Sequence, residues 1–176
     1  MGRLTLNPVA HIDPVMTILV PVVLVATTGF AFGGAKPVPV SYHRLRSPLR
    51  DMMFVALAGP ISNVLLAFVF GFAFYACGVF LDMDTRSLAM RVLAASIQFN
   101  LILAVFNMIP IPPLDGSRVL AFFLPRDLRE PYVRLETFGM LIVFGLLMTG
   151  TLSAILSPAV SWGLGVVNSF YGAIFY

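Results

Sequence analysis

The sequence predicts an all-α membrane protein, a polytopic helical bundle of about four to five hydrophobic segments with a short strand or turn region at the N-terminus. Of its 176 residues, 59% are hydrophobic and only 11% are charged. A soluble domain of this length cannot bury so much apolar surface in one core, so most of the surface must face lipid. Uncharged stretches also reach the roughly 20 residues that an apolar helix needs to cross a bilayer; they span 14–35, 52–81, 92–114 and 137–176.

Residues 1–176 are predicted to form a single membrane-embedded domain, with hydrophobic segments near 14–34, 52–81, 88–109, 137–156 and 158–176. The first segment contains two prolines and several glycines, so crossing the membrane and dipping into it remain alternatives. A straight helix over 52–81 would measure about 45 Å, and tilting or a kink at Pro60 must absorb the excess. The uncharged C-terminal stretch is too long for one crossing, and Ser157-Pro158 is the expected break.

Outside these segments, the chain predicts extended structure in two places near the N-terminus. Residues 1–13 are rich in turn formers, and the alternation in Arg3-Leu4-Thr5-Leu6 is typical of a short strand. The prolines of Lys36-Pro37-Val38-Pro39-Val40 exclude a helix interior, because each lacks a backbone donor. We expect an edge strand or an extended loop there.

Small and polar residues mark one face on each of two predicted helices. Gly59, Asn63, Ala67 and Gly71 recur every fourth residue, which places them in one stripe that should meet another helix closely. In the following helix, Ser96, Asn100 and Asn107 share a polar face. Amides inside a bilayer need partners, so this face should look inward.

The charged residues predict the orientation of the chain in the membrane. Lys and Arg concentrate in the loops 35–51 and 118–136, which should therefore be cytoplasmic. These arginines are dispersed among acidic residues and flanked by membrane spans, so a nucleic-acid partner is not expected. Cys77 is the only cysteine, which excludes an intrachain disulfide and a cysteine-based metal site.

The most informative segment runs from Asn107 to Gly116 and places three prolines and the carboxylate of Asp115 directly after a span. The helix must break there, and a carboxylate at that depth costs roughly 2.5–3.5 kcal/mol unless it has a partner. A metal, a cation or hydrogen bonds could supply this partner. Alternatively, Asp115 caps a helix beginning at Gly116-Ser117-Arg118, or pairs with Arg118 near the surface.

Three segments resemble motifs of the site-2 protease family, the zinc metalloproteases that cut transmembrane substrates within the bilayer. Asn107 through Gly116, including Pro110, resembles the family's Asn-Pro-Asp-Gly signature. Ala58-Gly59-Pro60-Ile61-Ser62-Asn63 is similar to its Gly-x-x-x-Asn motif. The segment Asn7 to Pro14, which contains His11, resembles a segment that follows the catalytic helix in compact bacterial members. The matches occur in family order and imply a bacterial plasma membrane protein with a transmembrane protein substrate.

The resemblance implies that Asp115 is the third ligand of a catalytic Zn²⁺. The other two ligands would be the histidines of a His-Glu-x-x-His helix, with the glutamate as general base. This sequence has no such motif, since His11 and His43 are its only histidines and neither is followed by Glu. The chain alone is therefore expected to be inactive.

Three explanations of this gap stay open. In the first, the sequence is an N-terminally incomplete part of an active protease. In the second, it is a non-catalytic membrane adaptor, a pseudoprotease that binds transmembrane segments without cutting them. In the third, His11 or His43 joins Asp115 on a rearranged metal site, which would require distant loops to converge.

Further roles follow from the resemblance. Asn63 and Asn107 would hold the substrate or polarise its carbonyl group, and interhelical hydrogen bonding is the alternative. His11 could lie beside the metal helix, or be a turn histidine bonded to backbone. The extended Val38-Pro39-Val40 edge could pair with an unwound substrate by strand addition.

Overall fold

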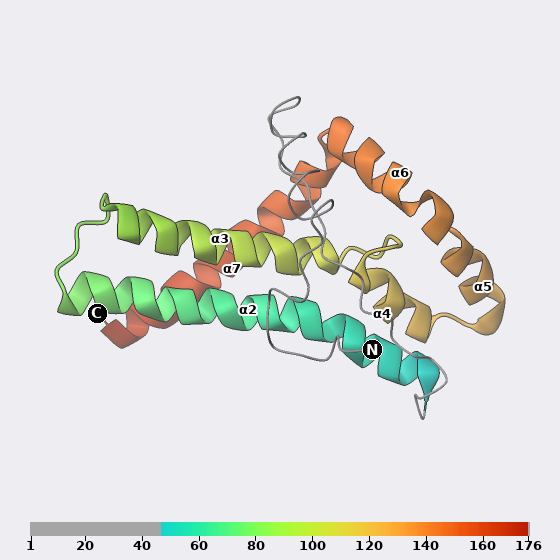
Figure 1. Ribbon diagram of the computed structural model, residues 1–176, viewed down its shortest axis with the longest axis horizontal. Coiled ribbons are helices and arrows are strands. Elements are labelled where there is room, and N and C mark those ends of the chain that lie inside the picture. The colour runs from blue at the N-terminus through green and yellow to red at the C-terminus, as the bar shows by residue number, and fades with distance from the viewer. Residues whose placement is uncertain (1–46, 176) are drawn as a thin grey trace, which may run out of the picture. The chain divides into compact units, whose positions relative to one another are not determined.

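The computed structural model describes residues 47–175, which form six helices (Figure 1). They are α2 (Pro48–Phe80), α3 (Leu88–Asn107), α4 (Asp115–Phe123), α5 (Arg126–Arg134), α6 (Glu136–Met148) and α7 (Thr151–Phe175). The predicted all-helical membrane class is confirmed. Three helices, α2, α3 and α7, are long and apolar enough to cross a membrane, and α5 with α6 meets the same test as a pair bent by 66°. The segment 14–34, the N-terminal strand, His11 and Val38-Pro39-Val40 lie outside the described residues.

Helix α2 forms one uninterrupted helix of 33 residues, about 50 Å at 1.5 Å per residue. Pro48 occupies its first turn, where the missing N–H costs nothing, and the Asp51 carboxylate accepts a hydrogen bond of 3.1 Å from the Ser47 N–H. Pro60 is buried in the middle of the helix without ending it. The excess length over a hydrocarbon core of about 30 Å is therefore accommodated within a continuous helix.

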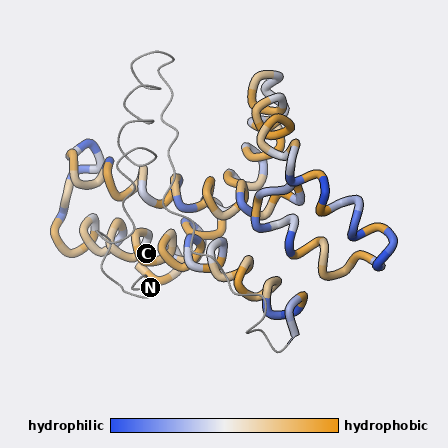
Figure 2. Tube along the Cα trace, turned by 45° about the vertical axis from the view of Figure 1, so that its right-hand side comes forward, coloured by the Kyte–Doolittle hydropathy of each residue, from blue (hydrophilic) through white to orange (hydrophobic). Residues whose placement is uncertain are grey.

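Helices α2 and α3 are joined by a short turn and pack against each other (Figure 1). Asp82 adopts a left-handed conformation (φ 47°), and the Asp84 side chain accepts a 2.8 Å bond from the Arg86 N–H. The Ser87 hydroxyl group then caps α3 by accepting from the Met90 N–H. Figure 2 shows hydrophilic residues in this turn and in α5, whereas the long helices are mostly hydrophobic.

The predicted stripe of small residues is a helix-packing face. Ala67 is fully buried, and a Cβ atom added at Gly71 would lie 2.8 Å from the Tyr171 ring and 2.9 Å from the Val167 side chain of α7. The Tyr171 hydroxyl group donates a 2.7 Å hydrogen bond to the Phe68 carbonyl of α2. This part of the stripe therefore holds α7 against α2, as the spacing predicted.

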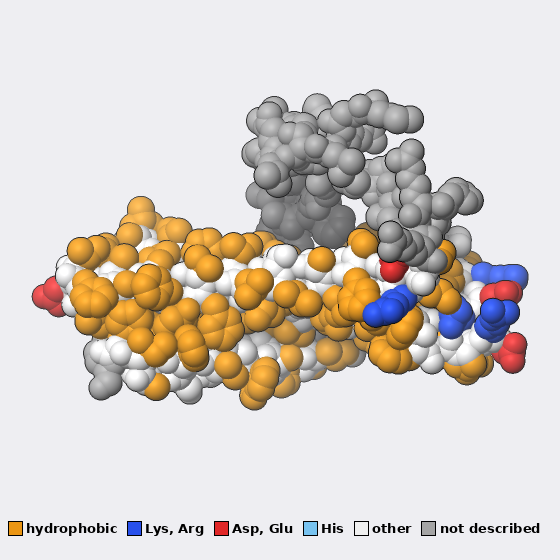
Figure 3. Space-filling model, turned by 90° about the horizontal axis from the view of Figure 1, so that it is seen from below, with side chains coloured by type: hydrophobic (Ala, Val, Ile, Leu, Met, Phe, Trp, Pro, Cys, Tyr) orange, Lys and Arg blue, Asp and Glu red, His pale blue; other side chains and the backbone are white. Residues whose placement is uncertain are grey.

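Outside this contact between α2 and α7, most large apolar side chains are exposed. On α2, for example, Leu65, Val69 and Phe72 are 61%, 60% and 55% exposed. Figure 3 shows hydrophobic side chains over most of the visible face of the long helices, with charged side chains gathered toward its ends. A surface of this kind is stable in lipid and would aggregate in water, as expected for an integral membrane protein.

The predicted boundary between the last two hydrophobic segments is wrong. The break expected at Ser157-Pro158 lies at Gly150, whose φ of 73° ends α6, while α7 continues through Pro158. A glycine in the left-handed conformation releases the helix at no steric cost, whereas a proline in a membrane helix removes only one hydrogen bond. The segments 137–156 and 158–176 therefore become the 13-residue α6 and the 25-residue α7.

The stretch 118–136, predicted as a loop, is mostly helical and contains the rest of α4 and all of α5. Arg129 explains how two such short helices are held together. Its guanidinium group donates hydrogen bonds of 2.7 Å to the Ala121 carbonyl and 2.6 Å to the Leu124 carbonyl, at the C-terminal end of α4. Charge-assisted bonds to these otherwise unpaired carbonyl groups stabilise the helix end.

Candidate active site

Helix α3 ends at Asn107 because the following loop contains Pro110, Pro112 and Pro113, which cannot donate helical hydrogen bonds. We call residues 108–114 the proline loop. Within it, the Ile111 N–H donates to the Ile109 carbonyl at 2.8 Å and the Leu114 N–H to the Ile111 carbonyl at 2.9 Å. These few local bonds form a tight turn that leads directly into α4.

Gly116 allows α4 to begin against this loop. A Cβ atom at position 116 would overlap the Met108 carbonyl group and would lie 2.7 Å from the Ile109 carbonyl oxygen. Its φ is not positive, so the glycine is required by space and not by backbone conformation. The sequence singled out Gly116 as part of the motif, and the structure supplies this physical reason.

Asp115 is the first residue of α4, and its side chain lies over α2. A Cβ atom built on Gly59 would be 3.3 Å from the Asp115 Oδ2 atom, so the absence of a side chain at Gly59 leaves room for the carboxylate. The capping alternative is wrong, because Leu114 is the N-cap and no side-chain hydrogen bond caps the helix. The motif that contains Gly59 and the motif that contains Asp115 thus meet, although the two residues are more than 50 positions apart in sequence.

The surroundings of Asp115 make its negative charge costly. The side chain is half-buried, and this burial raises the pKa of the Asp115 carboxyl group above its ordinary value. Arg118 lowers the same pKa, but by less than burial raises it. An ionised carboxylate at this place therefore gains from a further cationic partner.

The two candidate residues Asn63 and Asn107 differ from Asn100 in how their side-chain amides are used. Asn100 donates a 2.8 Å bond from its side chain to the Ser96 carbonyl of its own helix. Asn63 lies one helical turn from Gly59 on α2, and Asn107 is the last residue of α3; both are half-buried. Among the residues from 47 to 175, neither side chain hydrogen-bonds to another helix. Among the described helices, interhelical hydrogen bonding thus does not account for these two amides.

The predicted polar face of α3 is only partly inward. Ser96, Asn100 and Asn107 are half-buried, whereas the fully buried positions of α3 are Met90, Ile97, Leu101 and Ala104. Ser96 and Asn100 satisfy their side chains on carbonyl groups one turn earlier in the same helix. Because these hydrogen bonds are made within α3, the side chains of Ser96 and Asn100 need no partner on another helix.

The described residues contain one candidate metal ligand at the site. Within 47–175, no three His, Cys, Asp or Glu side chains come together in a way that could hold a metal ion. Asp115 fits as one oxygen ligand, because its carboxylate is half-buried, is not used in capping and occupies the space left by Gly59. A catalytic zinc normally takes three protein ligands, so two more would have to come from elsewhere.

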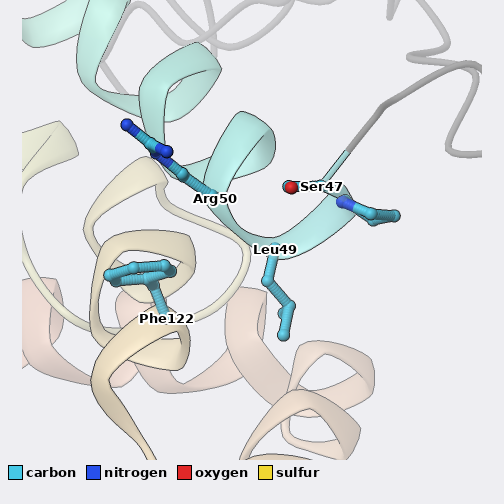
Figure 4. A pocket seen from close by; sticks show the side chains of 5 residues that line it. Ser47, Leu49, Arg50 and Phe122 are labelled. Atoms are coloured by element: carbon cyan, nitrogen blue, oxygen red, sulfur yellow. The ribbon is translucent and has the colours of Figure 1, made fainter.

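A separate hollow of about 410 Å³ lies at the start of α2 and is lined by Ser47, Pro48, Leu49, Arg50 and Phe122 (Figure 4). Arg50 also places its guanidinium carbon 5.6 Å from the centre of the Phe54 ring. The hollow contains neither Asp115 nor the asparagines. It therefore does not belong to the site.

Sequence reasoning missed two residues that contact the proline loop. The Tyr132 hydroxyl group of α5 donates a 2.8 Å hydrogen bond to the Pro110 carbonyl. Gly139 of α6 is buried where a Cβ atom would overlap the Pro112 carbonyl group. Neither residue lies in a recognisable motif, and only their places opposite the prolines reveal them.

The fold and the site together define a helical integral membrane protein with a carboxylate at a proline-broken helix end. The model of Peptidase family M50 matches residues 79–150, which include α3, the proline loop and Asp115. "Putative zinc metalloprotease YwhC" of Bacillus subtilis is 36% identical over 185 residues, covering 99% of this chain and 78% of that protein. The chain therefore belongs to peptidase family M50, the site-2 protease family of zinc metalloproteases.

Two further relatives carry similar names. "Putative zinc metalloprotease Rip2" of Mycolicibacterium smegmatis is 31% identical over 168 residues, which is 92% of this chain and 60% of that protein. "Putative zinc metalloprotease MJ0611" of Methanocaldococcus jannaschii is 46% identical over 66 residues, or 38% of this chain and 31% of that protein. No solved structure matches the chain significantly.

Proposed function

We propose that the protein containing this chain is an intramembrane zinc endopeptidase, with Asp115 as one of the metal ligands and membrane-spanning proteins as substrates. The observation that carries this proposal is the Asp115 carboxylate, half-buried over Gly59 beside a proline-broken helix end. Family membership and the zinc metalloprotease names of the relatives support it.

The residues of this chain would do the following. Asp115 would hold the metal ion by its carboxylate, at the point where α4 begins against α2. When bound, zinc supplies a Lewis acid that polarises the peptide carbonyl and lowers the pKa of a water molecule. The remaining ligands and the general base would come from a His-Glu-x-x-His motif that this sequence does not contain.

Asn63 and Asn107 would bind the substrate backbone near the carboxylate, because amide N–H groups can stabilise negative charge on a carbonyl oxygen. The Val38-Pro39-Val40 segment would pair with the unwound substrate as an added strand. The arginine-rich region over 118–136 would face the cytoplasm of a bacterial cell.

The proposal is tested by the metal content of the natural membrane protein that contains this chain. After purification in detergent without added chelator, elemental analysis should find about one zinc per polypeptide. A protein of the same preparation with Asp115 replaced by alanine should contain much less. Equal zinc in both proteins, or none in either, would contradict the assigned role.

Asn107 provides a second test, with a matched control on the same helix. Asn107→Ala should lower cleavage of a membrane substrate by about 100-fold, the loss typical for removing one oxyanion donor. Asn100→Ala should change cleavage by less than about threefold, because the Asn100 amide is used within its own helix. Equal effects of the two replacements would show that Asn107 has no special part in the reaction.

The rival function is a membrane adaptor that binds transmembrane segments without cutting them. It is favoured by one observation, that the sequence lacks His-Glu-x-x-His. If this explanation holds, a membrane substrate will copurify uncut with the natural protein, and added zinc will not start its cleavage. Processing of that substrate in the presence of zinc would exclude the adaptor.

A further inference from the structure

The proline loop is poorly held by its own hydrogen bonds. Three of its seven residues are prolines, which have no N–H group to donate. Its internal bonds from Ile111 and Leu114 close only short turns. Contacts from other helices must therefore decide where the loop, and with it the first residue of α4, is placed.

Two such contacts come from α5 and α6, one at each half of the loop. The Tyr132 hydroxyl group donates to the Pro110 carbonyl at 2.8 Å, and Ser117 lies beside the same hydroxyl group. On α6, Gly139 is the only fully buried residue, and it packs directly on the Pro112 carbonyl and on Pro113. Most other side chains of α6 are exposed, including Leu141 at 70%.

Helix α5 is itself fixed before it reaches the loop. Arg129, three residues before Tyr132, binds the C-terminal carbonyl groups of α4 through two hydrogen bonds. The start of α4 thus meets the loop at Gly116, and its end meets α5 at Arg129. Tyr132 therefore links α5, which is bound to the end of α4, to the proline loop that precedes α4.

We propose that Tyr132 is a positioning residue for Asp115, acting by holding the Pro110 carbonyl so that the proline loop presents the carboxylate over Gly59. This inference rests on the proposed function for its catalytic consequence. Tyr132 need not touch the substrate or the metal. It acts through the loop, and Gly139 supports the same loop from the other helix.

A matched control exists because a second tyrosine makes the same kind of bond elsewhere. Tyr171 donates to the Phe68 carbonyl at 2.7 Å, but that carbonyl lies within α2, whose position the helix already determines. Tyr132→Phe and Tyr171→Phe each remove one hydroxyl-to-carbonyl bond and keep the ring. Of these two hydrogen bonds, only the one from Tyr132 holds a loop.

The experiment compares both variants in the natural protein, purified in detergent. In Tyr132→Phe, amide hydrogen exchange over residues 108–117 should become about fivefold faster, Co²⁺ affinity should fall by a similar factor, and kcat should fall more than KM changes. Tyr171→Phe should leave all three unchanged while lowering the unfolding midpoint. Gly139→Ala should speed exchange over the same residues by more than Tyr132→Phe does, because its added Cβ atom would overlap the Pro112 carbonyl group.

Two outcomes would overturn the inference: unchanged exchange and Co²⁺ affinity in Tyr132→Phe, or the same changes in Tyr171→Phe. Its failure is distinguishable from failure of the proposed function. If Asp115→Asn still cleaves substrate, the proposed function fails, and the exchange measurement still decides whether Tyr132 holds the loop. If Asp115→Asn is inactive and Tyr132→Phe behaves as the natural protein, only the positioning role is lost.

Discussion

Replacing Asp115 with asparagine in the natural protein is expected to lower cleavage of a membrane substrate by more than about 100-fold. Asparagine keeps the shape of the side chain but lacks the negative charge that a zinc ligand needs. Changes to groups that merely support a metal ligand already cost 10 to 100-fold, roughly, in affinity or activity. Loss of the ligand charge itself should cost at least as much.

The folded protein should survive this substitution. Burial raises the pKa of the Asp115 carboxyl group, so the ionised side chain is costly to hold at that place and a neutral amide is not. The measurement is cleavage rate together with an unfolding curve of the same preparation. Asp127→Asn is the matched control, because Asp127 is an exposed aspartate on α5. Normal cleavage by the Asp115 variant would refute the ligand role.

Gly116→Ala should destabilise the protein by about 3 kcal/mol or more and abolish cleavage. The added methyl group would overlap the Met108 carbonyl, which is backbone and cannot rotate away as a flexible side chain would. Forcing an extra carbon into a packed contact typically costs about 1–3 kcal/mol, and backbone obstruction lies at the upper end. Separation of the loop from α4 would also move Asp115 away from Gly59.

Gly165→Ala is the matched control for this prediction. Gly165 is also helical, but a Cβ atom there would meet nothing within 4 Å. Alanine in an open helical position should be neutral or stabilise by up to about 1 kcal/mol. Unfolding in detergent, followed by circular dichroism, compares the two variants. A Gly116 variant as stable as the Gly165 variant would show that the loop yields easily.

Besides α3, helix α2 packs against two further partners, α4 and α7. Its first half packs against α4, with Gly59 beneath Asp115, and its second half packs against α7 through Gly71. Gly59 lies 11 residues after the start of α2, about 16 Å along its axis. The carboxylate is therefore set well inside the length of the helix and not at its end.

Several features were determined by the sequence alone. Composition identified a helical membrane protein, because an apolar surface of this size is stable only in lipid. The prolines after Asn107 ended α3 where expected, since a missing N–H group acts locally. The stripe through Ala67 and Gly71 predicted a close helix contact, and the motif around Asp115 pointed to the family that the relatives support.

Only the tertiary structure decided which residues surround the carboxylate and the loop before it. Gly59 approaches this region from α2, and Tyr132 and Gly139 approach it from α5 and α6. In a membrane protein both the lipid-facing and the protein-facing sides of a helix are apolar, so hydrophobic periodicity cannot tell which face meets which neighbour. The break between α6 and α7 at Gly150 was also missed. The left-handed conformation of Gly150 separates the two helices, whereas Pro158 is tolerated inside α7.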